Sequence, residues 1–361
     1  MMKRREFLAG LGALTLASPA FAETKVNGHV IVEDKNKILR NVPDTPVDRI
    51  PNYRRYMRQM VQELGNAAHA RDMEVLVRDA PELLTMERLE VDWYKIREPS
   101  AEHPAEGEQY VDYLNAIDGL IIDGLYVGHD AYGVPTDKPT AAPLHEAAEI
   151  LRKTERQVFS IEYTQDDKLA AEITKKLEAA GITPFIDREG DLSLSSLPKG
   201  RPPHENPRHV TELSEVKNWL PMMHADSFED RDAWVEAMKH SSYDLLLLDP
   251  FCKGKPLTKA HVEALHYKSF GSRRLVFARL PVGLAFANRW YWKPEWKKAP
   301  PNYMRPADPA DPNTWIVEYW NPDWKATLAQ YFDGLVAQGY DGLLLDNVDA
   351  YILYEEEYPI E

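Results

Sequence analysis

The residues best suited to chemistry in this chain stand near its C-terminus, directly after a short apolar run. Residues 343–345 are three leucines, and Asp346, Asn347 and Asp349 follow them. A run that is apolar at every position is typical of a strand buried on both faces, as in a parallel sheet. Carboxylates are costly to bury unless they are solvated or paired, and barrel enzymes carry their catalytic groups at the carboxyl ends of the strands. The motif therefore predicts a buried parallel strand with a site at its end.

Eight apolar runs recur along the chain and are separated mostly by segments with helical spacing. The predicted strands are residues 73–77, 117–122, 158–161, 182–186, 219–223, 245–248, 275–280 and 343–345, and the predicted helices include 53–68, 143–153, 167–180, 230–240, 258–267 and 324–338. This repeated strand–helix alternation predicts an α/β fold, a (β/α)8 TIM barrel. The competing arrangement is a doubly wound open sheet. That fold usually carries a Gly-rich phosphate turn after its first strand, and the sequence has none.

Acidic side chains follow most of the predicted strands. They are Asp79, Asp123, Glu162, Asp187, Asp226 and Asp249. Aspartate is also common in loops and helix caps, which accounts for part of the pattern. A barrel nevertheless brings all of its strand ends to one mouth, so we expect a mouth lined with acids, which would bind sugars or cations.

The N-terminus has the features of an export signal. Lys3, Arg4 and Arg5 precede an apolar stretch at residues 8–17, and an Ala-x-Ala site closes at Ala22. The adjacent arginines followed by Phe-Leu predict a twin-arginine signal peptide over residues 1–22, and an ordinary secretory signal is the alternative. We expect a periplasmic or secreted protein whose mature part, residues 23–361, is a single soluble barrel with no membrane span.

Composition excludes several classes of function. The formal net charge is -15 for the whole chain and about -17 without the leader, which disfavours nucleic acid and anionic lipid as partners. Cys252 is the only cysteine, so an intrachain disulfide and a multi-cysteine metal site are excluded. The histidines form no H-x-x-x-H or H-E-x-x-H pattern. We therefore expect no metal site. We also expect no cofactor and a monomer, and the expected acid-lined mouth would bind an oligosaccharide or polysaccharide.

Two segments interrupt the alternation. Residues 188–215 are polar and Pro-rich, which predicts a long connector. Residues 288–324 contain seven prolines and six of the nine tryptophans, which predicts a long loop. On the active face of a barrel such a loop could stack sugar rings, and the alternative is that its aromatic side chains pack against one another.

Four motifs in the second half of the chain resemble a known family. They are YDLLLLD at 243–249, RWYWKPEW at 289–296, VEYWNPDW at 317–324 and the Asp346/Asp349 motif. Their order and spacing over about 110 residues resemble the N-terminal half of glycoside hydrolase family 114-type barrels, the endo-α-1,4-polygalactosaminidase-like proteins. The resemblance implies a TIM barrel that hydrolyses an amino-sugar polymer with a pair of carboxyl groups.

The first half of the chain resembles the second half of that family. Residues 23–187 match the family's later strands, residues 216–361 match its beginning, and residues 188–215 would join the ancestral termini. We therefore predict a circular permutant, an exchange that is easy when the two termini of a fold lie close together. The hypothesis requires the strand at 343–345 to pair with the strand at 73–77.

The chain departs from the family pattern near its expected active site. Relatives carry a Gly-Glu-Ala-Glu segment where this chain has Gly283-Leu284-Ala285-Phe286, so both glutamates are replaced by apolar residues. Asp123 stands where relatives tend to have a glutamate, and Arg78-Asp79 stands where they often have Gln-Asn.

The remaining carboxylates define the predicted site. We expect Asp346 to be the ionised partner and Glu162 or Asp123 to be the acid, with a pKa raised by neighbouring carboxylates. Asp249 would contact substrate or serve as a structural acid paired with Arg279. The other predicted substrate-binding residues are Asp349, Asn347, Tyr351, Arg289, Tyr291, Trp292 and Trp320.

Three functions agree with these features. The first is an exported glycoside hydrolase acting on an amino-sugar-containing polysaccharide. The second is a carbohydrate-binding barrel that has lost catalysis with the family glutamates. The third is a periplasmic scaffold protein.

Overall fold

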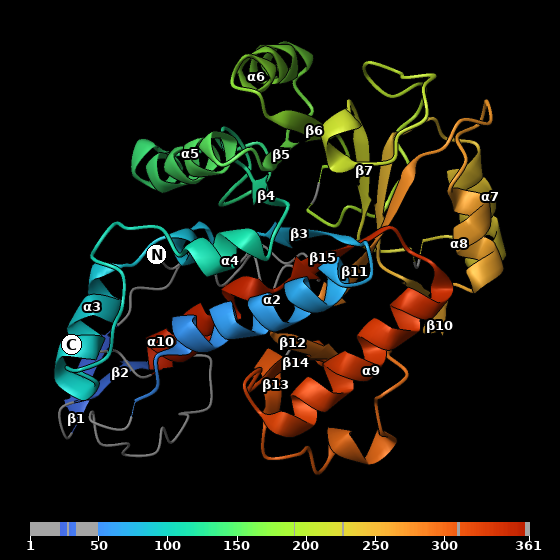
Figure 1. Ribbon diagram of the computed structural model, residues 1–361. Coiled ribbons are helices and arrows are strands. Elements are labelled where there is room, and N and C mark those ends of the chain that lie inside the picture. The colour runs from blue at the N-terminus through green and yellow to red at the C-terminus, as the bar shows by residue number, and fades with distance from the viewer. Residues whose placement is uncertain are drawn as a thin grey trace.

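The computed structural model describes residues 50–190, 192–225, 227–308 and 311–357, together with the backbone of a short hairpin (Figure 1). The hairpin consists of β1 (Ala22–Val26) and β2 (His29–Glu33), which pair in antiparallel fashion. The predicted signal peptide, apart from Ala22, lies outside the described residues, and so does Asp226.

An eight-stranded parallel sheet forms the centre of the molecule. Its strands are β3 (Glu74–Arg78), β4 (Gly119–Asp123), β5 (Gln157–Tyr163), β6 (Thr183–Asp187), β7 (Trp219–Met222), β8 (Leu245–Leu248), β11 (Leu275–Pro281) and β15 (Gly342–Asp346). Their order in the sheet is β6-β5-β4-β3-β15-β11-β8-β7. The sheet is nearly closed and barrel-like, consistent with a TIM-like barrel. Each of the eight predicted strands is confirmed, because a strand buried on both faces is apolar along its length.

Helices surround the sheet (Figure 1). They are α2 (Tyr53–His69), α3 (Arg88–Arg97), α4 (Val111–Asn115), α5 (Lys138–Lys153), α6 (Asp167–Ala179), α7 (Arg231–Lys239), α8 (Lys259–Leu265), α9 (Pro322–Gln338) and α10 (Tyr351–Glu357), with short 3-10 turns η2 (Pro81–Leu84), η3 (Leu213–Glu215), η4 (Pro294–Lys297) and η5 (Val348–Ala350). The six predicted helices are confirmed. Side chains such as Asn52 and Asp166 accept a hydrogen bond from the first turn of their helices, and Gly339 ends α9 with a φ of 87°.

The C-terminal strand β15 lies in the middle of the sheet. Leu343 is aligned with Val75 on β3 and with Ala278 on β11. This pairing meets the condition set by the permutation hypothesis. It also places the Asp346 motif at the centre of the mouth.

The sheet has a seam between β6 and β7, which share no ladder of hydrogen bonds. The ring of Trp219 fills the seam, because it lies 5.2 Å from Phe159 and 5.9 Å from Phe185. Its indole nitrogen donates a hydrogen bond of 3.3 Å to the carbonyl of Thr183. The described residues between β6 and β7 contain η3 but no α-helix, so the predicted connector is confirmed in this part of the chain.

The prediction of one long loop over residues 288–324 is wrong in part. A second sheet of order β12-β14-β13 is formed by β12 (Leu284–Phe286), β13 (Met304–Asp308) and β14 (Asp311–Val317). The prolines of this segment led to the prediction of a loop in place of the strands. Pro306 lies in the edge strand β13, where proline is tolerated, beside an irregularity in the register. A small hairpin of β9 (Phe251–Cys252) and β10 (Lys255–Pro256) follows β8.

Candidate functional site

Three aspartates and three arginines alternate at the carboxyl ends of the barrel strands. In spatial order they are Asp123, Arg78, Asp346, Arg279, Asp249 and Arg289. We call this set the mouth network. Five members come from β3, β4, β8, β11 and β15 or directly follow them, and Arg289 follows β12. Leu345 is aligned with Val77, so the next residues along the two strands, Asp346 and Arg78, are neighbours.

Asp346 lies between two guanidinium groups. It accepts a hydrogen bond from Nε of Arg279, and Nη1 of Arg78 lies 3.8 Å from its Oδ1. The residue is only 3% exposed. Burial favours the protonated form, but the charges of Arg279 and Arg78 outweigh it and hold the pKa of Asp346 below its usual value. The carboxyl group is therefore ionised at neutral pH.

The pKa of Asp123 shifts in the opposite direction to that of Asp346. Burial raises the pKa of its carboxyl group, the charge of Arg78 opposes that rise, and the nearby carboxylate of Asp346 adds to it. Nε of Arg78 lies 3.0 Å from Oδ2 of Asp123, and the hydroxyl of Tyr163 lies 3.4 Å from the same oxygen. The other oxygen, Oδ1, is buried and has no hydrogen-bond partner among the described residues. Because Arg78 and Tyr163 contact Oδ2, a proton held by Asp123 would lie on Oδ1.

Asp249 is held by two arginines and the backbone. Its Oδ2 accepts hydrogen bonds from Arg289 and, at 3.4 Å, from Arg279, while Oδ1 accepts one from the amide of Phe251 at 3.0 Å. The pairing with Arg279, offered as an alternative from the sequence, is present. The guanidinium of Arg289 also lies over the rings of Phe251 and Phe286, at 4.7 and 5.3 Å.

These pairs show that three of the acids expected in the mouth are matched by arginines. Each of the aspartates Asp123, Asp249 and Asp346 contacts at least one arginine, and the six members of the mouth network balance in formal charge. The physical reason is the cost of burial, since carboxylates at 2–4% exposure need a counter-charge to remain ionised. The mouth network, with its six groups in their ordinary charge states, therefore carries no net charge that would favour a cationic substrate.

Glu162 is fully buried, and its carboxyl group contacts backbone amides and a hydroxyl group. Its Oε2 accepts hydrogen bonds from the amides of Tyr126 and Val127 at 3.0 and 2.8 Å, and its Oε1 accepts one from the hydroxyl of Ser160 at 2.6 Å. Burial raises the pKa of Glu162 to about 7, although these three donors oppose the rise. The contacts fix the loop that follows β4.

The turn after Asp346 brings Asn347 and Asp349 close to the network. Asn347 has a φ of 57° and begins η5, and its Oδ1 is buried without a hydrogen-bond partner among the described residues. Asp349 is 7% exposed. Gly283 permits this turn to approach β11, because a Cβ there would lie 2.6 Å from the carbonyl oxygen of Asn347. Tyr351 is fully buried, and its hydroxyl donates to Glu82 at 3.1 Å.

The aromatic residues predicted to bind sugar pack mainly against one another. Trp292 lies 5.5 Å from Trp296 and 5.3 Å from Trp315. Trp320 lies in a cluster with Tyr53, Tyr56, Tyr319 and Tyr354. The hydroxyl of Tyr291 accepts a hydrogen bond from the amide of Phe286 at 3.0 Å. The structure thus favours the alternative given above, in which these side chains hold their segment together.

Sequence reasoning did not assign Arg78, Tyr163 or His129 to the site. Arg78 was noted only as a departure from the family, although an arginine at the end of an otherwise apolar strand signals a buried counter-charge. His129 is 8% exposed in the loop after β4, and its positive charge would lower the pKa of Asp123. No three His, Cys, Asp or Glu side chains in the described residues are grouped so that they could hold a metal ion. Among the same residues, no helix is long and apolar enough to cross a membrane.

Comparison with known proteins finds relatives but no family. No family model matches the chain. It is similar to an uncharacterized protein of Methanocaldococcus jannaschii, with 27% identity over 42% of this chain and 43% of the relative. It is also similar to uncharacterized proteins of Deinococcus radiodurans (32% identity over 32% of this chain and 37% of the relative) and Thermotoga maritima (34% over 22% and 25%). The chain spans less than half the length of each of these relatives.

Proposed function

We propose that the barrel mouth is the active site of a glycoside hydrolase, with Asp346 as the ionised carboxylate and Asp123 as the proton donor. The observation that carries this proposal is that one guanidinium, Arg78, contacts both carboxyl groups while their pKa values are shifted in opposite directions. A pair of carboxyl groups with separated pKa values is the arrangement that acid/base hydrolysis needs.

The reaction assigns one bond change to each residue. Asp123 transfers its proton to the glycosidic oxygen as the bond from that oxygen to the anomeric carbon breaks. In one route Asp346 attacks the anomeric carbon, and water activated by the deprotonated Asp123 then breaks the resulting ester bond, which gives retention. In the other route Asp346 removes a proton from the water that attacks the anomeric carbon, which gives inversion. The low pKa of Asp346 suits both roles, and the high pKa of Asp123 suits the donor.

The contacts support Asp123 over Glu162 as the proposed acid. Both oxygens of Glu162 already accept hydrogen bonds from Ser160 and from the loop amides of Tyr126 and Val127. Asp123 retains an oxygen without a partner. We therefore assign Glu162 to holding the loop and Asp123 to the chemistry.

An amino-sugar polymer is the substrate class that we propose, and the family resemblance is its support. We also propose that the protein is exported, and the support is the N-terminal sequence. The mouth network supports a reaction that uses two carboxyl groups in a buried polar site. It does not favour a substrate of either charge.

The test measures reducing ends released from partly deacetylated glucosamine and galactosamine polymers. Asp346→Asn and Asp123→Asn should each lower turnover by about 100-fold or more, because each removes one half of the acid/base pair. Asp333→Asn on α9 is the matched control, since this aspartate has a side chain that is 69% exposed. Turnover that survives both mouth substitutions would contradict the assignment.

A second candidate function is carbohydrate binding without turnover. It is favoured by Leu284 and Phe286, which are 2% and 7% exposed where the resembling family carries glutamates. The ring of Phe286 lies 5.3 Å from the guanidinium groups of both Arg279 and Arg289. Binding of an oligosaccharide with equal affinity by the wild type and by Asp346→Asn, without product from either, would support this function and overturn the first.

We also propose that the chain is a circular permutant. The support is the seam at β6 and β7, where the connector runs. The pairing of β15 with β3 is required by this proposal, although any closed barrel also pairs its first and last strands.

A further inference from the structure

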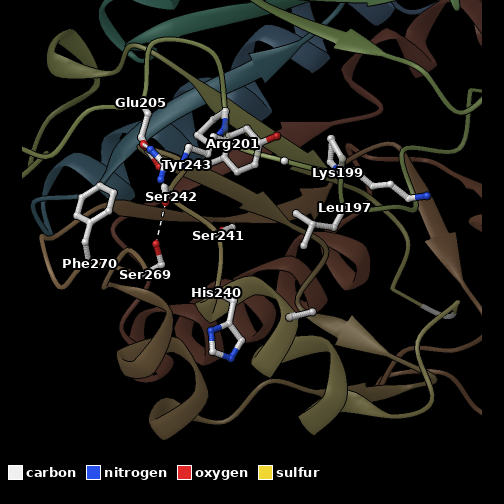
Figure 2. Close-up of a pocket in the computed structure, with 14 residues that line it drawn as sticks. Leu197, Lys199, Arg201, Glu205, His240, Ser241, Ser242, Tyr243, Ser269 and Phe270 are labelled. Carbon is white, nitrogen blue, oxygen red and sulfur yellow. Dashed lines mark hydrogen bonds and ion pairs between the residues drawn. The ribbon is translucent and has the colours of Figure 1, made fainter.

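The connector runs across the amino ends of the barrel strands, at the opposite end from the mouth. Its first part walls a cavity of about 670 Å3 beside α7 (Figure 2). Beyond the cavity, the buried ammonium of Lys268 donates hydrogen bonds to the carbonyls of Asn206 and Arg208 at 2.7 and 2.9 Å. The same ammonium pairs with Asp244, which directly precedes β8. A buried ion pair therefore holds the middle of the connector against the barrel.

The end of the connector is held by a carboxyl group instead. The amide of Leu213, the first residue of η3, donates hydrogen bonds to both side-chain oxygens of Glu74 at 3.1 and 3.0 Å. Leu213 is only 1% exposed. Glu74 is the first residue of β3, so one side chain joins the connector to a central strand of the barrel.

Carboxyl groups face Glu74 from each neighbouring element. Asp118 directly precedes β4 and Asp341 directly precedes β15, and these two strands flank β3 in the sheet. On the side of the connector, Glu212 directly precedes η3. The charges of all three oppose ionisation of Glu74.

The cations at this end of the barrel contact the two flanking aspartates. His69 at the end of α2 lies 2.9 Å from Asp118, and His266 at the end of α8 lies 3.0 Å from Asp341. Arg273 pairs with Asp341 at 2.5 Å. Glu74 forms no ion pair within the described part of the chain, so it experiences the like charges of its neighbours without a counter-charge of its own.

We propose that Glu74 is a pH-dependent switch for the end of the connector. The protonated side chain holds Leu213 against the barrel, and loss of its proton to solvent favours release of η3, because water can then solvate the carboxylate. The released segment is short. It lies between the carbonyl of Arg208, bound by Lys268, and Lys217, whose amide donates to Asp244 at 2.9 Å.

The direction of the switch follows from proton linkage. Burial raises the pKa of Glu74 to about 7, the three neighbouring carboxylates add to the rise, and the bond from Leu213 opposes it. A released and solvated side chain would titrate near the ordinary value of 4.5. The attached state therefore binds more protons between these two values, and release becomes easier as the pH rises through this window. The switch does not depend on the reaction proposed for the mouth.

The experiment measures hydrogen exchange of the Leu213 amide by NMR in the mature chain. The measured rate divided by the intrinsic rate of an unfolded peptide at the same pH gives the opening constant. From about pH 5 to about pH 7 this constant should rise about 40-fold, given the two pKa values above. In Glu74→Gln it should stay within about threefold, because the side chain cannot ionise and its oxygen can still accept the bond from Leu213.

Glu162→Gln is the matched control, because the pKa of Glu162 is also raised to about 7 but this residue holds a loop at the mouth. It should keep the wild-type response of Leu213. The amide of Leu344, fully buried in β15, reports opening of the whole barrel. The same pH response of Leu213 in Glu74→Gln as in the wild type would overturn the switch, and so would opening that increases toward low pH. Exchange of Leu344 as fast as that of Leu213 would also overturn it, because the whole barrel would then be opening.

Discussion

Arg78 is the residue on which the mouth network depends. It contacts Asp123 and Asp346, which come from strands on either side of β3. A buried cation between two buried anions lowers the energy of both ionised forms, and its own charge is compensated by theirs. The pKa values of the two carboxyl groups nevertheless shift in opposite directions, because Asp346 has a second arginine partner in Arg279.

Replacing Arg78 with glutamine should raise the pKa values of both aspartates. The guanidinium charge lowers each of them in the folded protein, so its loss favours the protonated forms. We also expect the free energy of unfolding at neutral pH to fall by about 3 kcal/mol, the usual cost of breaking a buried ion pair. Carbon-13 NMR titration of labelled aspartate side chains measures the first effect, with Asp346→Asn and Asp123→Asn used to assign the signals.

Arg88→Gln is the matched control for this experiment, because the side chain of Arg88 is 78% exposed. It should leave both titrations and the unfolding curve unchanged. A titration of Asp346 that is the same in Arg78→Gln as in the wild type would show that Arg279 alone sets its pKa.

The residues of the site could be predicted only in part. The aspartates at the strand ends were visible in the sequence because each follows an apolar run. The pairing of Asp249 with Arg279 was offered as an alternative, but the other pairs were not, since Arg78 is 45 positions from Asp123 and Arg279 is 67 positions from Asp346. Such pairs depend on which strands are neighbours in the sheet, and the local sequence does not determine the strand order.

At the scale of elements, Glu162 connects strand β5 to the loop that follows β4. The amides of Tyr126 and Val127 are held by this one side chain, and its ionisation is opposed by burial. A loop at the mouth is therefore positioned by a titratable group. Its stability should depend on pH.

The sign of that dependence follows from the pKa of about 7, which lies above the ordinary value of 4.5. Between these values the folded protein binds more protons than the unfolded chain, so the free energy of unfolding should fall as the pH rises from about 4.5 to 7. Glu74, with a pKa also raised to about 7 by burial, contributes in the same window. Urea unfolding measured at several pH values gives this dependence. In Glu162→Gln the free energy of unfolding should fall less steeply with pH, and the part of the fall that is due to Glu74 should remain.

Glu162→Ala provides the comparison. It leaves the two amides and the hydroxyl of Ser160 without an acceptor, so it should lose about 3 kcal/mol of stability, whereas the amide of Gln can still accept a bond. An unchanged slope in Glu162→Gln would mean that Glu162 does not titrate in this range.

Prediction of elements succeeded where short-range physics decides them. The strands buried on both faces and the amphipathic helices have periodic patterns, and Asn52 and Gly339 mark two of the helix ends. Prediction failed for β12, β13 and β14. Those strands contain Pro306 and Pro312, and they are stabilised by pairing with each other across a long loop rather than by a pattern of their own.

At the scale of the whole molecule, the two ends of the described barrel lie close together. Arg54 near the start of α2 pairs with Glu355 in α10 through a contact of 2.9 Å. The opposite seam, between β6 and β7, is closed by Trp219 and the connector. The barrel therefore offers two places where a chain could begin and end.

A rearranged chain tests this directly. It would begin at Arg201, continue to Glu357, pass through a short Gly-Ser linker to Ile50 and end at Gly200. We expect it to fold with a free energy of unfolding within about 2 kcal/mol of residues 50–357 in the native order, because termini that lie close together can be exchanged cheaply. Urea unfolding of both chains gives the comparison, and a rearranged chain that fails to fold would contradict the permutation hypothesis.

The sequence by itself determined the strands, most of the helices and the carboxylates at the strand ends, because burial patterns and caps act over a few residues. Only the tertiary structure decided that β15 lies between β3 and β11 and that three arginines compensate the mouth. It also decided that the connector leaves a cavity beside α7. These features depend on how the strands close into a barrel, which brings together charges and surfaces that are tens of residues apart in the chain.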